Sequence, residues 1–281
     1  MDGVNQNISP ADDVNLATEV EVMTTYVPPT MTHLIQSNNV DWTLTDAQVE
    51  SVEENTRGQG STSSWMDQRL GRITASNTHR VLTKVRRLRA NRAIGRPIDC
   101  LPLIESLCNE PADIDEVEAV KYGRTMEPEA RQQYIKCLRN RGHKNVDVQQ
   151  CGLFVDKENS FIGASPDGLV SCCCGQGLLE IKCPLKSSHV DPNRELPSYI
   201  DIKDGKYNLK KNHTQGYYSQ VITQMGVTGR KWCDFFVYSR HGTITIRVPF
   251  DASHWEHIVD ACKTFFFEHM VDYMKTRNVE N

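Results

Sequence analysis

The sequence lacks two features that would place the protein in or across a membrane. It contains no run of about 18 apolar residues, the length that a membrane-spanning helix requires. Its first residues, MDGVNQNISPADD, lack the basic region and the apolar core of a secretory signal. We therefore predict an intracellular protein, in the nucleus or the cytoplasm, with no membrane partner. In that setting the ten cysteines are expected to be reduced thiols rather than a disulfide framework.

Basic residues are scarce at the N-terminus and concentrated further on. Residues 1–60 contain ten acids and a single base, Arg57. Residues 1–40 are polar without sustained periodicity, so we predict a disordered acidic tail over residues 1–44. Residues 80–96 contain seven bases and no acid, which predicts a path for a polyanion such as DNA, although a solvated helix face has the same composition. The seven bases are Arg80, Lys84, Arg86, Arg87, Arg89, Arg92 and Arg96.

Beyond residue 45 the pattern changes from helical to β-rich and back to helical. Thr45 and Gln48 form a capping box that should open a helix ending near Asn55. Residues 65–85 should form a helical turn, a break at a glycine and a second helix that starts near Ser76. Further helices are expected at 101–108, 115–140, 209–227 and 253–274. Strands are expected within 146–183 and as a pair at 231–239 and 243–250. Ser76 and Ser253 are the expected N-caps, and Pro128 should start or kink a helix. These elements predict one α/β (α+β) domain over residues 45–281.

The stretch FIGASPDGLVSCCCGQGLLEIKCPLK, residues 161–186, places charged residues at the ends of two short apolar runs. If the runs form a hairpin, Asp167 begins one strand and Glu180 lies near the end of the other. Because side chains alternate along a strand, Glu180 and Lys182 share a face and Ile181 points into the core. Converging carboxylates repel each other unless a cation lies between them, and Mg²⁺ prefers oxygen ligands. The pattern favours metal-assisted hydrolysis of a phosphodiester; an exposed hairpin with charged residues on its solvent face is the alternative.

Four blocks of the sequence together resemble a known nuclease family. They are WMDQRLGRITAS (65–76), YGRTMEPEARQQY (122–134), GASPDGLV with LLEIKCP (163–184) and YYSQVITQMGVTG (217–229). The chain thereby resembles the lambda-exonuclease-like nucleases, in particular the YqaJ-type viral recombinase domain of the PD-(D/E)XK superfamily, over about residues 45–275. The resemblance implies a restriction-endonuclease-like core, in which helices flank a central mixed β-sheet. It also implies a Mg²⁺-dependent 5′-to-3′ exonuclease on duplex DNA, acting in recombination, repair or the processing of viral or mobile-element DNA.

The resemblance assigns a metal site to the acids already singled out. Asp167 and Glu180 resemble the two metal-binding acids of the family, with the carbonyl of Ile181 as a further ligand. Lys182 resembles the lysine that positions or activates the attacking water. Glu127 resembles an additional acid that holds a metal or its water; a solvated surface acid is the alternative. Two Mg²⁺ ions are implied, for which Mn²⁺ can substitute.

Four further residues resemble a pocket for a 5′-terminal phosphate. They are Arg69, Ser76, Ser165 and Gln220. An arginine offers a bidentate fork to phosphate, and a serine at a helix N-terminus adds a hydroxyl to free backbone N–H groups. The alternatives are an Arg69–Asp67 ion pair, an N-cap role alone for Ser76, and Gln224 in place of Gln220.

The resemblance also implies partners, and the sequence leaves two other functions open. The implied partners are double-stranded DNA ends, a single-strand annealing protein and two further copies of this chain in a ring-shaped homotrimer. A DNA-end-binding module of transposon or viral origin that does not cut is the main alternative, which the complete set of acids disfavours. A sequence-specific endonuclease is the other, which the 5′-phosphate pocket disfavours.

Three consecutive cysteines, Cys172 to Cys174, lie in the expected turn of the hairpin. Zinc ligands normally follow C-x₂₋₄-C spacing with a second Cys or His pair, and no such pair is near in the sequence. The histidines at 143, 189 and 213 show no ligand spacing either. We therefore predict a plain hairpin loop here rather than a structural zinc site.

Overall fold

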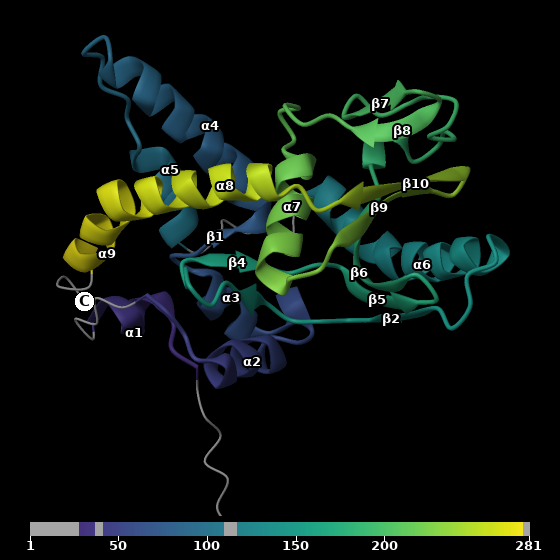
Figure 1. The fold of residues 1–281 in the computed structure, drawn as a ribbon, viewed down its shortest axis with the longest axis horizontal. Coiled ribbons are helices and arrows are strands. Elements are labelled where there is room, and N and C mark those ends of the chain that lie inside the picture. The colour runs from purple at the N-terminus through teal and green to yellow at the C-terminus, as the bar shows by residue number, and fades with distance from the viewer. Residues whose placement is uncertain (1–27, 37–41, 110–116, 278–281) are drawn as a thin grey trace, which may run out of the picture.

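A computed structural model describes residues 28–36, 42–109 and 117–277 of the 281-residue chain (Figure 1). Its α-helices are α1 (Met31–Gln36), α2 (Asp46–Asn55), α3 (Ser63–Arg69), α4 (Ala75–Arg92), α5 (Leu101–Cys108), α6 (Glu118–Asn140), α7 (Tyr217–Thr228), α8 (Ala252–Phe265) and α9 (Val271–Arg277). Its strands are β1 (Ile73–Thr74), β2 (Asp147–Gln149), β3 (Phe154–Val155), β4 (Ile162–Ala164), β5 (Gly168–Cys172), β6 (Gly175–Lys182), β7 (Ile200–Lys203), β8 (Lys206–Leu209), β9 (Trp232–Ser239) and β10 (Gly242–Pro249).

The central sheet has five strands in the order β10-β9-β6-β5-β2. The β6–β9 pair is parallel and the other pairs are antiparallel, so the predicted mixed sheet is confirmed. Alternation along β9 sends Phe235 and Val237 into one hydrophobic cluster and Phe236 and Tyr238 into another. Helix α7 packs in the first cluster and α6 in the second, so the sheet is covered on both faces.

Helix α6 covers its face of the sheet with one apolar stripe. Met126, Ala130, Tyr134 and Leu138 recur every four residues and are all buried against the central sheet. The helix continues through Pro128 rather than starting there. This packing holds α6 along β6, the strand that carries Glu180.

A second, smaller sheet has the order β1-β4-β3. Strands β1 and β4 run parallel, with Thr74 paired to Gly163. The chain leaves β1 directly into α4 and leaves β4 directly into the segment that contains Ser165. Because parallel strands end at the same edge, Ser76 and Ser165 both follow that edge.

Several predicted helix starts differ from the structure. The N-cap of α4 is Thr74, so the prediction of Ser76 as N-cap is wrong; Ser76 lies in the first turn. The N-cap of α8 is Asp251, whose side chain accepts from the N–H of His254, so the predicted Ser253 cap is also wrong. At α8 a carboxylate two residues before the serine already satisfies a free N–H group of the first turn.

The helix predicted over 209–227 begins only at Tyr217. Gly216 precedes it with φ 70°, a left-handed conformation outside the helix. Residues 200–209 form the β7–β8 hairpin instead, whose turn has Asp204 at φ 51° and Gly205 at φ 72°. Asp-Gly between alternating apolar residues is a strong hairpin signal, so this element was readable in the sequence.

Part of the predicted tail belongs to the packed fold. Met31, Leu34 and Ile35 of α1 are buried, and α1 packs against α9 (Figure 1). The ring of Trp42 meets that of Phe266 edge to face, 5.1 Å between centroids. The packed chain therefore includes 28–36 and 42–44; the remainder of the predicted tail lies outside the described residues. Among the described helices, none combines the length and apolarity needed to cross a membrane.

Candidate active site

Asp167 and Glu180 lie side by side where the β5–β6 ladder ends. Strand pairing places Gly168 opposite Leu179, and the N–H of Asp167 donates to the carbonyl of Leu179 at 3.1 Å. The N–H of Ile181 donates to Oδ2 of Asp167 at 2.6 Å, which fixes that carboxylate across the strand. Lys182 Nζ lies 2.5 Å from Oε1 of Glu180. The structure thus brings together the acid pair and the lysine that the sequence singled out.

The carboxylate of Glu180 is held on both oxygens by helix α7. Gln220 Nε2 donates to Oε1 and Gln224 Nε2 to Oε2, each at 2.6 Å. Glu180 is only 2% exposed, so the alternative of a solvent-facing hairpin does not describe this strand. Gln220, predicted for the phosphate pocket, contacts the acid cluster in this structure. Gln224 makes the same kind of contact with the other oxygen of Glu180. The four-residue spacing of the two glutamines indicates that they share one face of α7.

Glu127 reaches the same site from helix α6. Arg131, one turn later, donates through Nη2 to Oε1 of Glu127 at 2.6 Å and to the carbonyl of Asp167 at 2.7 Å. One guanidinium therefore ties the helix acid to the strand that carries Asp167. Arg131 was not singled out from the sequence, although its i,i+4 spacing from Glu127 indicated a pair.

The charged side chains of this cluster border an open cavity. A cavity of about 620 Å³ is lined by Glu127, Asp167, Ile181, Lys182 and Tyr217, among others. A second cavity of about 350 Å³ is lined by Trp65, Arg124, Glu127 and Arg131. Glu127 is therefore accessible from both cavities.

Burial and mutual repulsion perturb the charges of this cluster. Burial, and then the neighbouring Glu180, raise the pKa of Asp167 well above its usual value. Burial also raises the pKa of Glu127, against the opposing attraction of Arg131. Burial lowers the pKa of Lys182, but attraction to Glu180 and Asp167 outweighs it, so the pKa is raised. The lysine is therefore held as a cation beside carboxylates that it does not fully neutralise.

The donor set fits a hard divalent cation. Glu127 and Asp167 line the larger cavity together with Lys182, and Glu180 touches that lysine, so the cluster keeps an excess of negative charge. Oxygen donors of this kind are the ligands that Mg²⁺ takes, and a bound cation would offset both the burial and the repulsion by Glu180 that raise the pKa of Asp167. Asp167, Glu180, Glu127 and the carbonyl of Ile181 are the residues that would hold it.

A second group of side chains surrounds the indole of Trp65. The guanidinium of Arg69 lies 4.1 Å from the ring centroid, and Trp65 Nε1 donates to Ser165 Oγ at 3.0 Å. Desolvation lowers the pKa of Arg69 to about 10. Within the described residues Arg69 forms no ion pair with Asp67, and Ser76 contacts Thr74, 3.3 Å between hydroxyls. Arg69 and Ser165 thus form one cluster, without Gln220.

Comparison with known protein families finds a match for this chain. Residues 64–231 match the family model of the YqaJ-like viral recombinase domain, more than half of the chain. The chain belongs to this family. The matched segment contains the acids of the site and their neighbours, namely Glu127, Asp167, Glu180, Lys182, Arg69, Gln220 and Gln224.

The solved structures that resemble this YqaJ-like domain include an alkaline exonuclease. The alkaline exonuclease LHK-Exo from Laribacter hongkongensis is 26% identical over 78% of this chain and 99% of its own. The TM-score is 0.54 for its complex with dAMP and 0.50 for another structure of it. The shutoff and exonuclease protein of Kaposi's sarcoma associated herpesvirus, 12% identical over 83% of this chain and 75% of its own, shares the fold with a TM-score of 0.50. No curated protein matches. The predicted PD-(D/E)XK-type α/β fold is confirmed.

Several side chains of the basic segment, residues 80–96, already have ion-pair or hydrogen-bond partners within the fold. Arg89 pairs with Asp260 at 2.8 Å and Arg92 with Glu268 at 3.2 Å. Lys84 donates to a backbone carbonyl, and Arg80 donates to Asn77 and Ser106. In Figure 1 the C-terminal end of α4 extends away from β5, β6 and α6. Among the described residues only the side chains of Arg86, Arg87 and Arg96 in this run make no hydrogen bond or ion pair, and the basic path as a whole stays a prediction.

Proposed function

We propose that this chain is a divalent-metal-dependent deoxyribonuclease that hydrolyses phosphodiester bonds at DNA ends, with 5′-to-3′ polarity on duplex DNA. The observation that carries the proposal is one cavity lined by Glu127, Asp167 and Lys182, with the buried carboxylate of Glu180 2.5 Å from Lys182 Nζ. The similarity to LHK-Exo, described as an alkaline exonuclease and solved with dAMP, supports exonuclease activity. Recombination, repair or the processing of viral or mobile-element DNA is the proposed setting.

The proposed mechanism divides the work among residues of three elements. A divalent cation, when bound by the acids and the Ile181 carbonyl, would polarise the phosphodiester and stabilise the charge of the transition state. Gln220 and Gln224 hold the carboxylate of Glu180 in place, and Arg131 does the same for Glu127. Lys182, kept protonated by its neighbours and 4.8 Å from the centroid of the Tyr217 ring, would orient the attacking water.

Cleavage assays on defined ends test the proposal. Linear 5′-phosphorylated duplex, circular duplex and single strands are incubated with Mg²⁺, with Mn²⁺ or with EDTA. Degradation of the linear duplex from its 5′ ends, absent with EDTA, is the expected result. Binding of ends without cleavage in either metal would favour the binding-module alternative. Cutting of circular duplex at defined sequences would favour an endonuclease.

Replacing either glutamine of α7 by leucine is expected to lower the cleavage rate by about 10-fold to 100-fold, because groups that orient a metal ligand typically have effects of this size. The Mg²⁺ concentration for half-maximal rate should rise in Gln220→Leu and Gln224→Leu. The matched control is Gln132→Leu on the exposed side of α6. Wild-type rate and Mg²⁺ dependence in both α7 variants would exclude the positioning role.

Arg69→Ala is expected to reduce the preference for a 5′-phosphate over a 5′-hydroxyl end, because charge-assisted bonds from a guanidinium to phosphate are strong and directional. The ratio of the two cleavage rates should fall toward one, while the rate on 5′-hydroxyl ends changes little. Arg69→Lys keeps the charge but cannot donate two parallel hydrogen bonds to one phosphate. Its ratio of the rate on 5′-phosphate ends to the rate on 5′-hydroxyl ends should therefore be intermediate. Asp67→Asn is the control, since Asp67 is exposed. An unchanged ratio in Arg69→Ala would remove Arg69 from the phosphate pocket.

The basic segment offers a test with an internal control. Arg86→Gln with Arg87→Gln should weaken DNA binding on every sequence and lower the slope of log K against log salt by about 0.9 for each phosphate that is no longer neutralised. Arg89→Gln with Arg92→Gln removes the same charge from arginines that already have acidic partners, so its effect should be smaller. Equal slopes in wild type and both variants would make this segment a solvated helix face.

Assembly is a separate proposal that rests on the family resemblance. A homotrimeric ring would retain duplex DNA by topology, whereas a monomer holds it by charges that salt screens. Light scattering gives the mass, and digestion in the presence of a heparin trap gives the run length for each binding event. Affinity capture with a single-strand annealing protein tests that partner. A monomer with short runs would exclude the ring and leave the nuclease proposal standing.

A further inference from the structure

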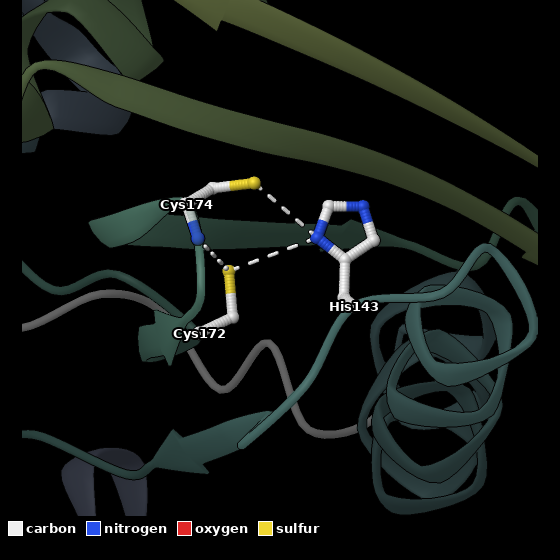
Figure 2. A group of neighbouring side chains, drawn as sticks. All are labelled: His143, Cys172 and Cys174. Carbon is white, nitrogen blue, oxygen red and sulfur yellow. Dashed lines mark hydrogen bonds between the residues drawn. The ribbon is translucent and has the colours of Figure 1, made fainter.

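Three potential metal ligands meet at the end of the β5–β6 hairpin opposite the acids. Cys172 ends β5, Cys174 precedes β6, and His143 lies in the connection between α6 and β2. His143 Nδ1 is 3.4 Å from Cys174 Sγ and 3.9 Å from Cys172 Sγ, and one ligand atom of each residue lies within 4.8 Å of the others. Figure 2 shows the ring nitrogen facing both sulfurs. His143, which shows no ligand spacing in the sequence, thus lies beside two of the three cysteines in the fold.

Strand pairing explains how distant residues meet. Strand β2 pairs with β5 so that Asp147 lies opposite Ser171, which places the chain before β2 beside the turn after β5. Two backbone contacts then fix the loop to the turn. The N–H of Cys173 donates to the carbonyl of Lys144 at 3.1 Å, and the N–H of Lys144 donates to Cys173 Sγ at 3.4 Å. The position of His143 relative to the sulfurs is thus set by the backbone.

We propose that His143, Cys172 and Cys174 form a zinc site that is separate from the proposed nuclease centre. In a tetrahedral site with Zn–S of about 2.3 Å and Zn–N of about 2.0 Å, sulfur and nitrogen lie about 3.5 Å apart, close to the observed 3.4 Å for Cys174 and somewhat shorter than the 3.9 Å for Cys172. Thiolate and imidazole ligands select zinc over the hard Mg²⁺ ion, which prefers oxygen. Glu180 lies six positions after Cys174, a distance of about 20 Å along β6.

Two groups of the fold lie close to the sulfurs of this cluster. The N–H of Cys174 donates to Cys172 Sγ at 3.4 Å. Arg247, which donates to Asp234 at 2.8 Å, lies near Cys174. Hydrogen bonds and positive charge stabilise a thiolate, the form that binds metal. Each thiol releases its proton on ligation, and the fourth position belongs to water or to Cys173, whose Sγ is 4.0 Å from His143 Nδ1.

The site would tie together the elements that carry the acid cluster. His143 follows the C-terminal end of α6, and the cysteines flank the tip of the β5–β6 hairpin. Glu127 lies in the N-terminal half of α6, while Asp167 and Glu180 lie at the opposite ends of β5 and β6. A zinc ion here would therefore brace the frame of the candidate active site without touching DNA or the catalytic cation.

Metal analysis of the reduced protein tests this site directly. The full chain is purified with a phosphine reductant, dialysed against zinc-free buffer with Mg²⁺, and analysed by mass spectrometry; about one zinc per chain is expected. The zinc is then exchanged for Co²⁺. Sulfur-to-cobalt charge-transfer absorption with tetrahedral d–d bands is expected, and oxygen ligands of the acid cluster cannot produce that charge transfer. Absence of both zinc and the charge-transfer band in the wild type would overturn the proposal without any variant.

Variants then assign the ligands. Cys172→Ser, Cys174→Ser and His143→Gln should each weaken Co²⁺ binding at least about tenfold, the lower range for altering a group next to a ligand. Cys108→Ser, a half-buried cysteine of α5, is the matched control, and Asp167→Asn should keep the full charge-transfer band. A weaker band in Cys173→Ser would identify it as the fourth ligand; an unchanged band assigns that position to water. Wild-type affinity in the three ligand variants would exclude the site.

Discussion

Asp167→Asn is expected to abolish cleavage and at the same time to raise the thermal stability of the metal-free protein. The carboxylate of Asp167 lies beside Glu180 and Glu127, and burial together with these acids raises its pKa. Asparagine keeps an oxygen that can accept from the N–H of Ile181 but carries no charge. The rate should fall by about 10³-fold or more, because a cation that stabilises the transition state contributes several kcal/mol and each step of about 1.4 kcal/mol is tenfold.

The stability change follows from the sign of the pKa shift. Since the folded-state pKa of Asp167 is raised, the unfolded chain releases this proton at lower pH than the folded chain does. Ionisation of Asp167 therefore destabilises the metal-free fold at pH above its ordinary pKa of about 4, and removing the charge should raise Tm at neutral pH by about 2–4 °C for each kcal/mol relieved.

Calorimetry with EDTA and with Mg²⁺ separates the two effects. In EDTA the variant should melt above the wild type. In Mg²⁺ the wild type should gain stability and the variant should gain much less, because a ligand that binds only the folded state stabilises it. Asp67→Asn, which changes an exposed acid, should show neither effect. A variant that cuts at the wild-type rate, or that gains as much from Mg²⁺ as the wild type, would contradict the assignment of Asp167 to the metal site.

The acid pair and the lysine could be predicted because they depend on local geometry. Alternation along a strand is enough to place Glu180 and Lys182 on one face and Ile181 on the other, and the structure has this arrangement. The capping box of Thr45 and Gln48 is local in the same way, and it is confirmed. Features that depend on a few neighbouring residues are readable without the fold.

The partners of these residues could not be predicted, because they come from distant parts of the chain. Gln224 reaches Glu180 only because α7 packs across β6, and sequence spacing carries no sign of that contact. The acidic partners of Arg89 and Arg92 lie in α8 and the π-helical turn after it, so composition alone could not show which of these bases have acidic neighbours. His143 meets the cysteines through the register of β2 on β5. In each case, the packing of segments far apart in the sequence decided which side chains come into contact.

Asp234→Ala is expected to cause a large loss of stability in the central sheet. Asp234 lies in β9, is 1% exposed and sits opposite Leu179 of β6. Its carboxylate accepts from Tyr134 at 2.7 Å and from Arg247 at 2.8 and 2.9 Å. Alanine would leave a buried hydroxyl and a partly buried guanidinium without their acceptor, which costs about 3–5 kcal/mol and lowers Tm by about 10 °C.

Two further variants show whether the cost comes from the unpaired groups or from the missing attraction. Tyr134→Phe removes one hydrogen bond and keeps the ring, so it should cost only about 1 kcal/mol. The triple variant Tyr134→Phe, Asp234→Leu, Arg247→Met replaces all three polar partners, and it should recover most of the stability that Asp234→Ala removes, because apolar packing often matches a buried ion pair. Asp234 does not belong to the acid cluster, so Asp234→Ala should still cut DNA at temperatures well below its lowered Tm. Because β9 pairs with β6, the strand that carries Glu180, activity should be lost as the variant melts. Chemical denaturation of all three variants gives the free energies, and a loss in Asp234→Ala no larger than in Tyr134→Phe would show that this carboxylate does not hold the sheet together.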